Sequence, residues 1–182
     1  MDLKKLEKHI ADNIKVIIAI DGPSAAGKSS LGYLLKERYD GLLIKTDDYF
    51  LHPSRKTEER LNEVGGNLDY ERLLEEVFTN VNEPTIQSNH FNCIKNILEN
   101  REPLVNKDIL IVEGVYSLHP MFLKYYTFKI FMDVEKDTQL KRIKERNGDV
   151  MLQRWINEWI PLEDKYFVEI DAKTIADLVI KT

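Results

Sequence analysis

A three-layer α/β/α sandwich with a mostly parallel five-stranded sheet and a helical lid is the fold that this sequence predicts. Short apolar runs alternate with segments of helical spacing, a pattern typical of parallel strands covered by helices on both faces. A glycine-containing loop stands between the first apolar run and the first long helix. The 182 residues fit one domain, residues 1–182, with the lid expected at about residues 136–160.

Composition narrows the class of protein. Hydrophobic residues make up 43% and charged residues 31%, ordinary values for a globular protein, and the net charge of −5 argues against a nucleic-acid partner. No apolar run is long enough to cross a bilayer, and residues 1–9 favour a short amphipathic surface helix over a secretion signal. The single cysteine, Cys93, excludes an internal disulfide, fits a cytoplasmic location, and is expected to be a small buried hydrophobe.

The glycine-containing loop carries the strongest motif. Residues 22–29 match G-x-x-x-x-G-K-[ST], between a strand-like run at 16–20 and a helix-like segment at 30–38. Gly22 and Gly27 allow tight turns, so that backbone N–H groups and the helix N-terminus point at phosphate oxygens. Lys28 is expected to reach the β- and γ-phosphates, and the Ser29 hydroxyl to bind Mg²⁺. A chance glycine turn would lack these flanking elements.

This loop therefore predicts a site for ATP or GTP with Mg²⁺. The residues expected to hold the nucleotide are Gly22, Ser24, Ala25, Ala26, Gly27, Lys28, Ser29 and Ser30.

The elements that follow continue the alternation. Further strands are expected at residues 41–46, 109–112, 127–132 and 176–180. Helices are expected at residues 69–80, 136–146 and 149–167. Residues 52–66 are polar without periodicity, which predicts a long loop of the kind that is usually functional or mobile.

Two acidic residues follow predicted strands directly. Asp47 comes after the second strand and Glu113 after the third, and ligands of such sheets bind at the carboxyl ends of the strands. We therefore expect Asp47 to accept a hydroxyl proton as general base and Glu113 to hold Mg²⁺ or its water. The alternatives are a solvated turn or helix cap for Asp47 and Asp48, and an ordinary loop carboxylate for Glu113.

Two arginines supply the third element of a phosphate site. Arg142 and Arg146 are four residues apart on a predicted helix, so they share a face and can converge on one anion. Phosphoryl transfer depends on positioning and charge neutralisation, which arginines on a movable helical lid would provide. The alternative is a solvated basic face paired with neighbouring acids.

The remaining conspicuous side chains are expected to be structural. Trp155 and Trp159, again four apart, favour core packing over a base-stacking role. His90 and His119 do not have the spacing of metal ligands.

These motifs together resemble the uridine kinase and phosphoribulokinase group of P-loop kinases, which also includes nicotinamide riboside kinase and bacterial pantothenate kinase. The resemblance is closest to a bacterial uridine kinase-like branch. The similar segments are residues 22–29, 46–50, 67–69, 111–114, 129–134, 140–146, 113–120 and 159–167. In that group the strand ending in Glu113 lies beside the P-loop strand and the strand ending in Asp47 lies one further out, roughly 10 Å from the P-loop.

The resemblance implies the P-loop NTPase fold and ATP-dependent phosphoryl transfer to a hydroxyl, with a nucleoside of the uridine or cytidine type as first candidate. It implies that Asp47 is the base, that Asp69 touches acceptor hydroxyls, and that Arg142 and Arg146 belong to the lid. With a ribonucleoside, Tyr49 is expected to help enclose the sugar. Other hydroxyl metabolites (nicotinamide riboside-like or pantothenate-like compounds) and nucleotides are the alternative acceptors.

The chain departs from this group at two places. Residues 91–95 replace a Tyr-Asp-Phe segment and its following His, and Arg146-Asn147 stands where Arg-Asp is usual. The phosphoryl-transfer residues are thus retained while the base pocket is altered.

Other nucleotide-binding classes fit less well. Residues 106–109 lack the final Asp of a GTPase guanine box, and no transporter signature is present. A nucleotide-binding module without catalysis is the alternative of a different class. The expected partner is a small-molecule acceptor, not nucleic acid or a membrane, and a homo-oligomer is left open.

Overall fold

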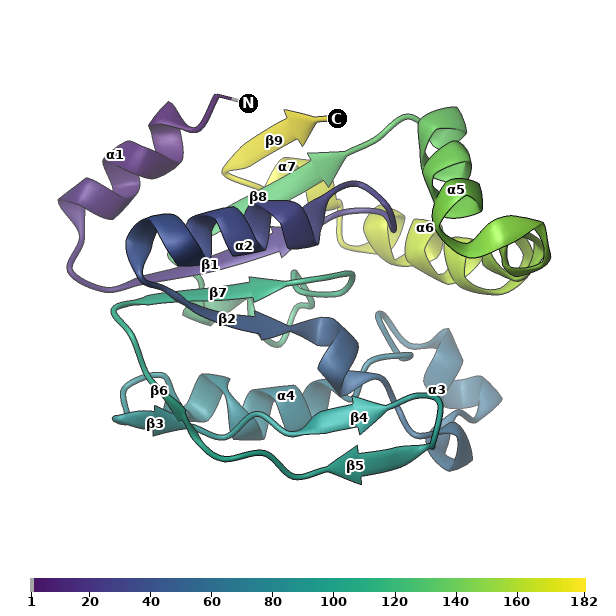
Figure 1. Ribbon diagram of the computed structural model, residues 1–182, viewed down its shortest axis with the longest axis horizontal. Helices are drawn as coiled ribbons and strands as arrows, with labels where there is room; N and C mark the ends of the chain where they lie inside the picture. The colour runs from purple at the N-terminus through teal and green to yellow at the C-terminus, as the bar shows by residue number, and fades with distance from the viewer. Residues whose placement is uncertain (1) are drawn as a thin grey trace.

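Every pairing within the central sheet is parallel. The computed structural model describes residues 2–182, and its five-stranded sheet has the order β2-β7-β1-β8-β9 (Figure 1). The strands are β1 (Val16–Asp21), β2 (Leu42–Lys45), β7 (Ile109–Glu113), β8 (Phe128–Asp133) and β9 (Leu178–Lys181). The predicted α/β fold is confirmed, and the sheet is wholly parallel where a mostly parallel one was expected.

The strand order brings the predicted catalytic segments to one edge. β7 lies between β1 and β2, with Glu113 in register with Ile20 on one side and Lys45 on the other. The carboxyl ends of these three strands therefore meet next to the loop that follows β1. This is the arrangement that the resemblance implied.

Alternation along β1 builds two apolar layers. Ile17 and Ala19 face one cluster, whereas Val16, Ile18 and Ile20 face the other. The second cluster is closed by α1 (Lys4–Asp12) and α2 (Lys28–Tyr39), and the first by α4 (Tyr70–Glu76) and α6 (Ile160–Glu169). Helices thus cover both faces of the sheet.

Residues 46–108 differ most from the expected elements. The loop at 52–66 contains a 3₁₀ turn, Pro53–Arg55, and a short helix, α3 (Glu58–Asn62). The helix expected at 69–80 is α4 followed by a 3₁₀ turn, Phe78–Asn80. Two small antiparallel pairs were not predicted, and they join β3 (Thr85–Ile86) to β6 (Leu104–Val105) and β4 (His90–Asn92) to β5 (Ile97–Glu99).

The segment predicted as the lid is helical with one break. α5 (Lys136–Arg154) is interrupted at Gly148, whose φ of 79° is a conformation that other residues rarely adopt. A π-helical turn, Trp155–Trp159, connects α5 to α6, and α7 (Ala172–Ile175) leads into β9. Figure 1 shows α5 and α6 together at the carboxyl ends of the strands. Over residues 2–182, no helix combines the length and apolarity that crossing a membrane requires.

Candidate active site

The loop after β1 has the shape that phosphate binding requires. Gly22 has a φ of 141°, and a Cβ built there would lie 2.3 Å from the carbonyl oxygen of Met132, so only glycine fits. Gly27, with a φ of 94°, is the N-cap of α2. The loop therefore enters the helix with its N-terminal N–H groups available for an anion.

A cavity of about 650 Å³ lies against this loop. That volume is within the usual range of small-molecule sites, roughly 300–1,000 Å³. Its walls include the predicted residues Ser24, Ala25, Gly27, Lys28, Ser29, Ser30, Asp47, Glu113, Arg142 and Arg146. Of the other two predicted nucleotide residues, Ala26 is buried in the core and Gly22 is outside the wall.

Ser29 and Glu113 place two oxygen donors side by side. The Ser29 hydroxyl donates to Oε2 of Glu113 at 3.3 Å, across the gap between α2 and β7. No cluster of three or more acidic, histidine or cysteine ligands occurs among residues 2–182. This donor set fits Mg²⁺, which is commonly held by one or two protein oxygens together with substrate phosphates and water.

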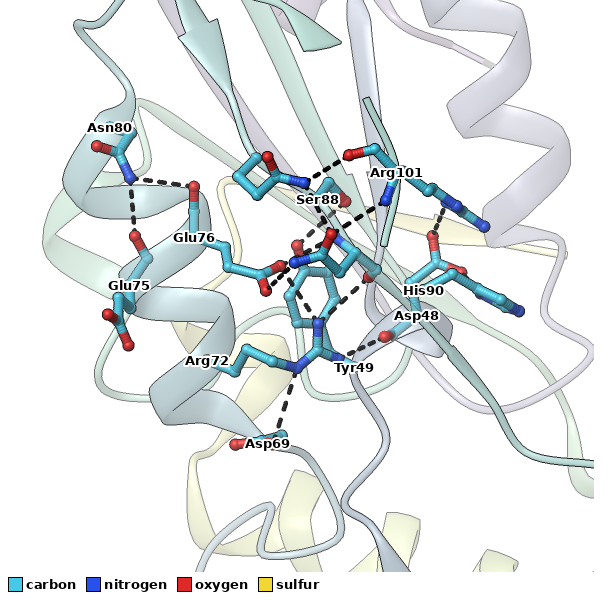
Figure 2. Close-up of polar contacts among 12 residues, drawn as sticks. Asp48, Tyr49, Asp69, Arg72, Glu75, Glu76, Asn80, Ser88, His90 and Arg101 are labelled. Atoms are coloured by element: carbon cyan, nitrogen blue, oxygen red, sulfur yellow. Dashed lines mark hydrogen bonds and ion pairs between the residues drawn. The ribbon is translucent and has the colours of Figure 1, made fainter. Parts of the chain in front are cut away.

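Within residues 2–182, Asp47 is the carboxylate of the 3₁₀ turn Thr46–Tyr49 that makes no ion pair or side-chain hydrogen bond. Its side chain is open to the cavity, whereas Asp48 accepts from Arg101 at 2.8 Å and contacts His90 at 2.5 Å (Figure 2). The two neighbouring acids thus differ in their surroundings. Asp48 contacts His90 of the β4–β5 pair, whereas Asp47 faces the cavity.

Both cavity acids have raised pKa values. Desolvation within the cavity raises the pKa of Asp47, and Lys28, Lys45 and Arg146 act in the opposite direction. Burial raises the pKa of Glu113, and the negative charge of Asp47 raises it further. The two carboxylates are therefore close enough to influence each other, and Lys28 lowers the pKa of both.

The predicted cations lie on the loop and on α5. Lys28 donates from Nζ to the carbonyl of Pro23 at 2.9 Å, and Arg142 donates to the carbonyl of Ala25 at 3.1 Å. The Arg146 guanidinium lies 5.8 Å from the ring centroid of Trp155. These cations make one wall of the cavity positive, as a bound triphosphate requires.

Two residues expected to contact the acceptor, Tyr49 and Asp69, do not line the cavity. Tyr49 is fully buried, donates to Ser88 Oγ at 3.1 Å, and packs under Arg72 (Figure 2). Asp69 is also buried, and its Oδ2 accepts from Arg55 at 2.8 Å. From the same 67–69 segment it is Asn67 that lines the cavity.

Three residues expected in the core line the cavity instead. Trp155 and Trp159 are half-buried, with ring centroids 4.6 Å apart in a T-shaped pair. Cys93 is exposed at the turn between β4 and β5 and also lines the cavity. A spacing of four residues is the same for a helix face that packs on a core and for one that faces a ligand. The sequence alone therefore could not distinguish these two positions for Trp155 and Trp159.

The expected structural histidine His119 is buried and bonded. Its Nε2 lies 2.8 Å from the carbonyl of Val64, and burial lowers the pKa of the ring to about 4.

Glu163 on α6 is a cavity residue that the sequence did not reveal. Its Oε2 accepts the Ser24 N–H at 2.9 Å, its Oε1 accepts the Ser24 hydroxyl, and burial raises its pKa. A buried carboxylate thus fixes α6 to the glycine-containing loop.

Ser29→Ala is expected to weaken the response to Mg²⁺. Loss of one oxygen ligand should raise the Mg²⁺ concentration for half-maximal activity by roughly tenfold, the effect of about 1.4 kcal/mol. Ser29→Thr keeps the hydroxyl and serves as the control. A Mg²⁺ titration that is identical in the wild-type and Ser29→Ala proteins would remove Ser29 from the metal site.

Comparison with known proteins supports the fold. No model of a known protein family matches the chain. A possible uridine kinase from Bacillus stearothermophilus is 17% identical, with a TM-score of 0.71 over 97% of this chain and 99% of that one. A putative fructose transport system kinase from a Silicibacter species is also 17% identical, with a TM-score of 0.72 over 98% of each chain.

Two further matches cover a smaller share of this chain. D-glycerate 3-kinase from Cryptococcus neoformans is 14% identical, with a TM-score of 0.54 over 88% of this chain and 83% of that one. The tRNA-specific adenosine deaminase subunit tad2 of Schizosaccharomyces pombe is 37% identical over 65 residues. That match spans 33% of this chain and only 16% of the fission yeast protein. At these identities and coverages, the comparisons establish the fold.

Proposed function

This chain has the P-loop kinase fold, and on that premise we propose that it transfers the γ-phosphoryl group of ATP to a hydroxyl of a small molecule. One observation carries the proposal. A single cavity brings together Lys28, the Ser29–Glu113 pair and the unpaired carboxylate of Asp47. These are a phosphate ligand, a metal-binding pair and a base, the three parts that phosphoryl transfer to an alcohol needs.

The glycine-containing loop and the side of the cavity formed by α5 would hold the nucleotide. Backbone N–H groups of the loop and Lys28 neutralise the β- and γ-phosphates, and Arg142 and Arg146 face the same phosphates from α5. Mg²⁺ held near Ser29 and Glu113 would neutralise phosphate charge. GTP would meet the same phosphate contacts.

Asp47 would activate the acceptor. The acceptor hydroxyl oxygen forms a bond to the γ-phosphorus, the bond from that phosphorus to the bridging oxygen of ADP breaks, and the hydroxyl proton passes to Asp47. Its raised pKa makes it a stronger base than an ordinary aspartate, which suits proton transfer from an alcohol.

Among the possible acceptors we propose a nucleoside first, because the sequence resembles the uridine kinase group and because of one feature of the cavity. Trp155 and Trp159 present aromatic surface on which a planar base can stack. The sugar contacts differ from the uridine kinase pattern, since Asp69 and Tyr49 lie outside the wall and Asn67 lies in it. The alternative acceptors are other hydroxyl metabolites and nucleotides.

We do not extend the deaminase activity of the fission yeast relative to this chain. The match covers 65 residues and only 16% of that protein's length. A cytoplasmic location, with a small molecule as partner, is part of the proposal and rests on composition.

A screen for acceptor-dependent ADP formation tests the proposal. The purified chain with MgATP is expected to form ADP faster when one member of a panel of nucleosides, nucleotides and vitamin precursors is added. The Lys28→Ala protein is the matched blank. Tight ATP binding without acceptor-dependent ADP formation across the panel would favour the non-catalytic nucleotide-binding module instead.

A further inference from the structure

Lys56 is a cation on the cavity wall without a protein partner. It follows the 3₁₀ turn Pro53–Arg55 and immediately precedes the N-cap of α3, and its side chain is half-buried and lines the cavity. Within residues 2–182 its ammonium group makes no hydrogen bond or ion pair. Burial lowers its pKa, as expected for a cation that no neighbouring acid stabilises.

Four acids of the surrounding segments are already paired with other cations. Asp48 is held by Arg101 and His90, and Asp69 by Arg55. Glu63 and Glu71 both pair with Arg60, at 3.2 and 2.7 Å. Asp47 lines the same cavity, and Glu58 and Glu59 follow Lys56 closely in the chain, but none of them makes an ion pair with it within residues 2–182. An anionic ligand in the cavity can therefore supply the charge partner that Lys56 lacks.

Lys56 stands apart from the phosphate-binding cations. Lys28, Lys45 and Arg146 lower the pKa of the Asp47 carboxyl group. The charge of Lys56 lowers the pKa of the Cys93 thiol, and the charges of Asp47 and Asp48 raise it, so Lys56 and these acids act on the same thiol. Lys28 belongs to the glycine-containing loop and Arg146 to α5, but Lys56 and Cys93 come from the segments after β2. In the proposed function the triphosphate binds to the cations of the glycine-containing loop and of α5. Lys56 is therefore available to bind the acceptor.

We propose that the acceptor carries an anionic group, a carboxylate or a phosphate, that pairs with Lys56 while its hydroxyl faces Asp47. The inference rests on the proposed function and narrows its substrate class. A cation in a partly desolvated site without a partner is unfavourable, and a charge-assisted hydrogen bond to an anion offsets that cost. A nucleoside with a carboxylate on its base meets the requirement, as does a carboxylated or phosphorylated polyol.

Binding of matched compound pairs tests this directly. The pairs are nicotinic acid riboside against nicotinamide riboside, pantothenate against its alcohol pantothenol, and uridine 3′-phosphate against uridine. One member of each pair, called the charged member below, carries an anionic group that the other lacks: a carboxylate in the first two pairs and a phosphate in the third. Calorimetric titration of the wild-type protein is expected to show binding of the member with the anionic group at least about tenfold tighter in one pair.

Variants of Lys56 then test whether this residue causes the preference for the member with the anionic group. Lys56→Met should reduce the ratio of affinities within the favoured pair to near one, and Lys56→Arg should keep most of it. Lys36→Met, which removes an exposed lysine of α2, is the control and should leave the ratio unchanged. A preference that survives in Lys56→Met, or no preference for the charged member in any pair, overturns the inference.

Binding and turnover separate this inference from the proposed function. If the charged member binds through Lys56 but no compound of the panel stimulates ADP formation, the anion site stands and the kinase proposal fails. If acceptors without an anionic group are phosphorylated as well as those with one, with equal affinity, the kinase proposal stands and the Lys56 inference fails.

Discussion

Lys28→Ala is expected to reduce acceptor-dependent ADP formation on the order of 10³-fold while the protein stays folded. Lys28 is the cation of the phosphate loop, and it would neutralise charge that grows on the β- and γ-phosphates as the transfer proceeds. Each 1.36 kcal/mol of lost stabilisation is about tenfold in rate, so an effect of this size is plain in a steady-state assay. The measurement is kcat for ADP formation with the best acceptor of the screen.

Two controls accompany this variant. Lys36→Ala removes a lysine from the exposed face of the same helix and should keep normal kcat. Thermal unfolding should show the Lys28→Ala protein folded, because Lys28 Nζ makes only a local hydrogen bond to Pro23. Near-normal kcat in Lys28→Ala would mean that the cavity is not the phosphate site.

Asp47→Asn is expected to lower kcat by a factor of about 10²–10⁴ with little change in ATP affinity. The amide keeps the shape of the side chain but cannot accept the hydroxyl proton. Isothermal titration with a non-hydrolysable ATP analogue measures the affinity separately from turnover. If ATP affinity collapses while kcat holds, Asp47 is a nucleotide or metal residue and its role is exchanged with that of Glu113.

Asp48→Asn is the matched control for this variant. It alters the ion pairs with Arg101 and His90, so it should act mainly on stability. The comparison therefore separates loss of a base from disturbance of the 3₁₀ turn that both residues share.

The pH dependence of kcat gives the same assignment a second readout. The base works in its deprotonated form, and desolvation raises the pKa of Asp47 above the ordinary value of about 3.9. Turnover should therefore fall as the pH drops through this raised pKa, at a higher pH than an ordinary aspartate would give. Asp47→Asn should lose that acidic limb.

The positions of the candidate site's loop and acids could be predicted from the sequence, because they depend on local geometry. The glycine-containing loop is one contiguous motif, and Asp47 lies just after β2 while Glu113 ends β7, two strands whose carboxyl ends meet in the parallel sheet. The parallel sheet could also be predicted, because the apolar runs are long enough to show that strands alternate with helices along the chain.

The rest depends on tertiary placement. Glu163 and Trp155 lie on helical segments whose spacing is equally compatible with solvent, core or cavity. Lys56 lines the cavity from a polar loop, directly after the 3₁₀ turn Pro53–Arg55, and polar loops give no periodic signal. The β4–β5 pair has strands of three residues, too short for alternation to show, and its turn contains Asn96 at a φ of 54°.

Transfer of the γ-phosphoryl group to a carbon-bound hydroxyl is tested most directly with ATP labelled by ¹⁸O at the three non-bridging γ-oxygens. Mass spectrometry of the reaction with the best acceptor is expected to show a phosphorylated acceptor with all three labelled oxygens and an unlabelled bridging oxygen from the acceptor itself, together with unlabelled ADP. Labelled inorganic phosphate without any phosphorylated acceptor would contradict the proposed function.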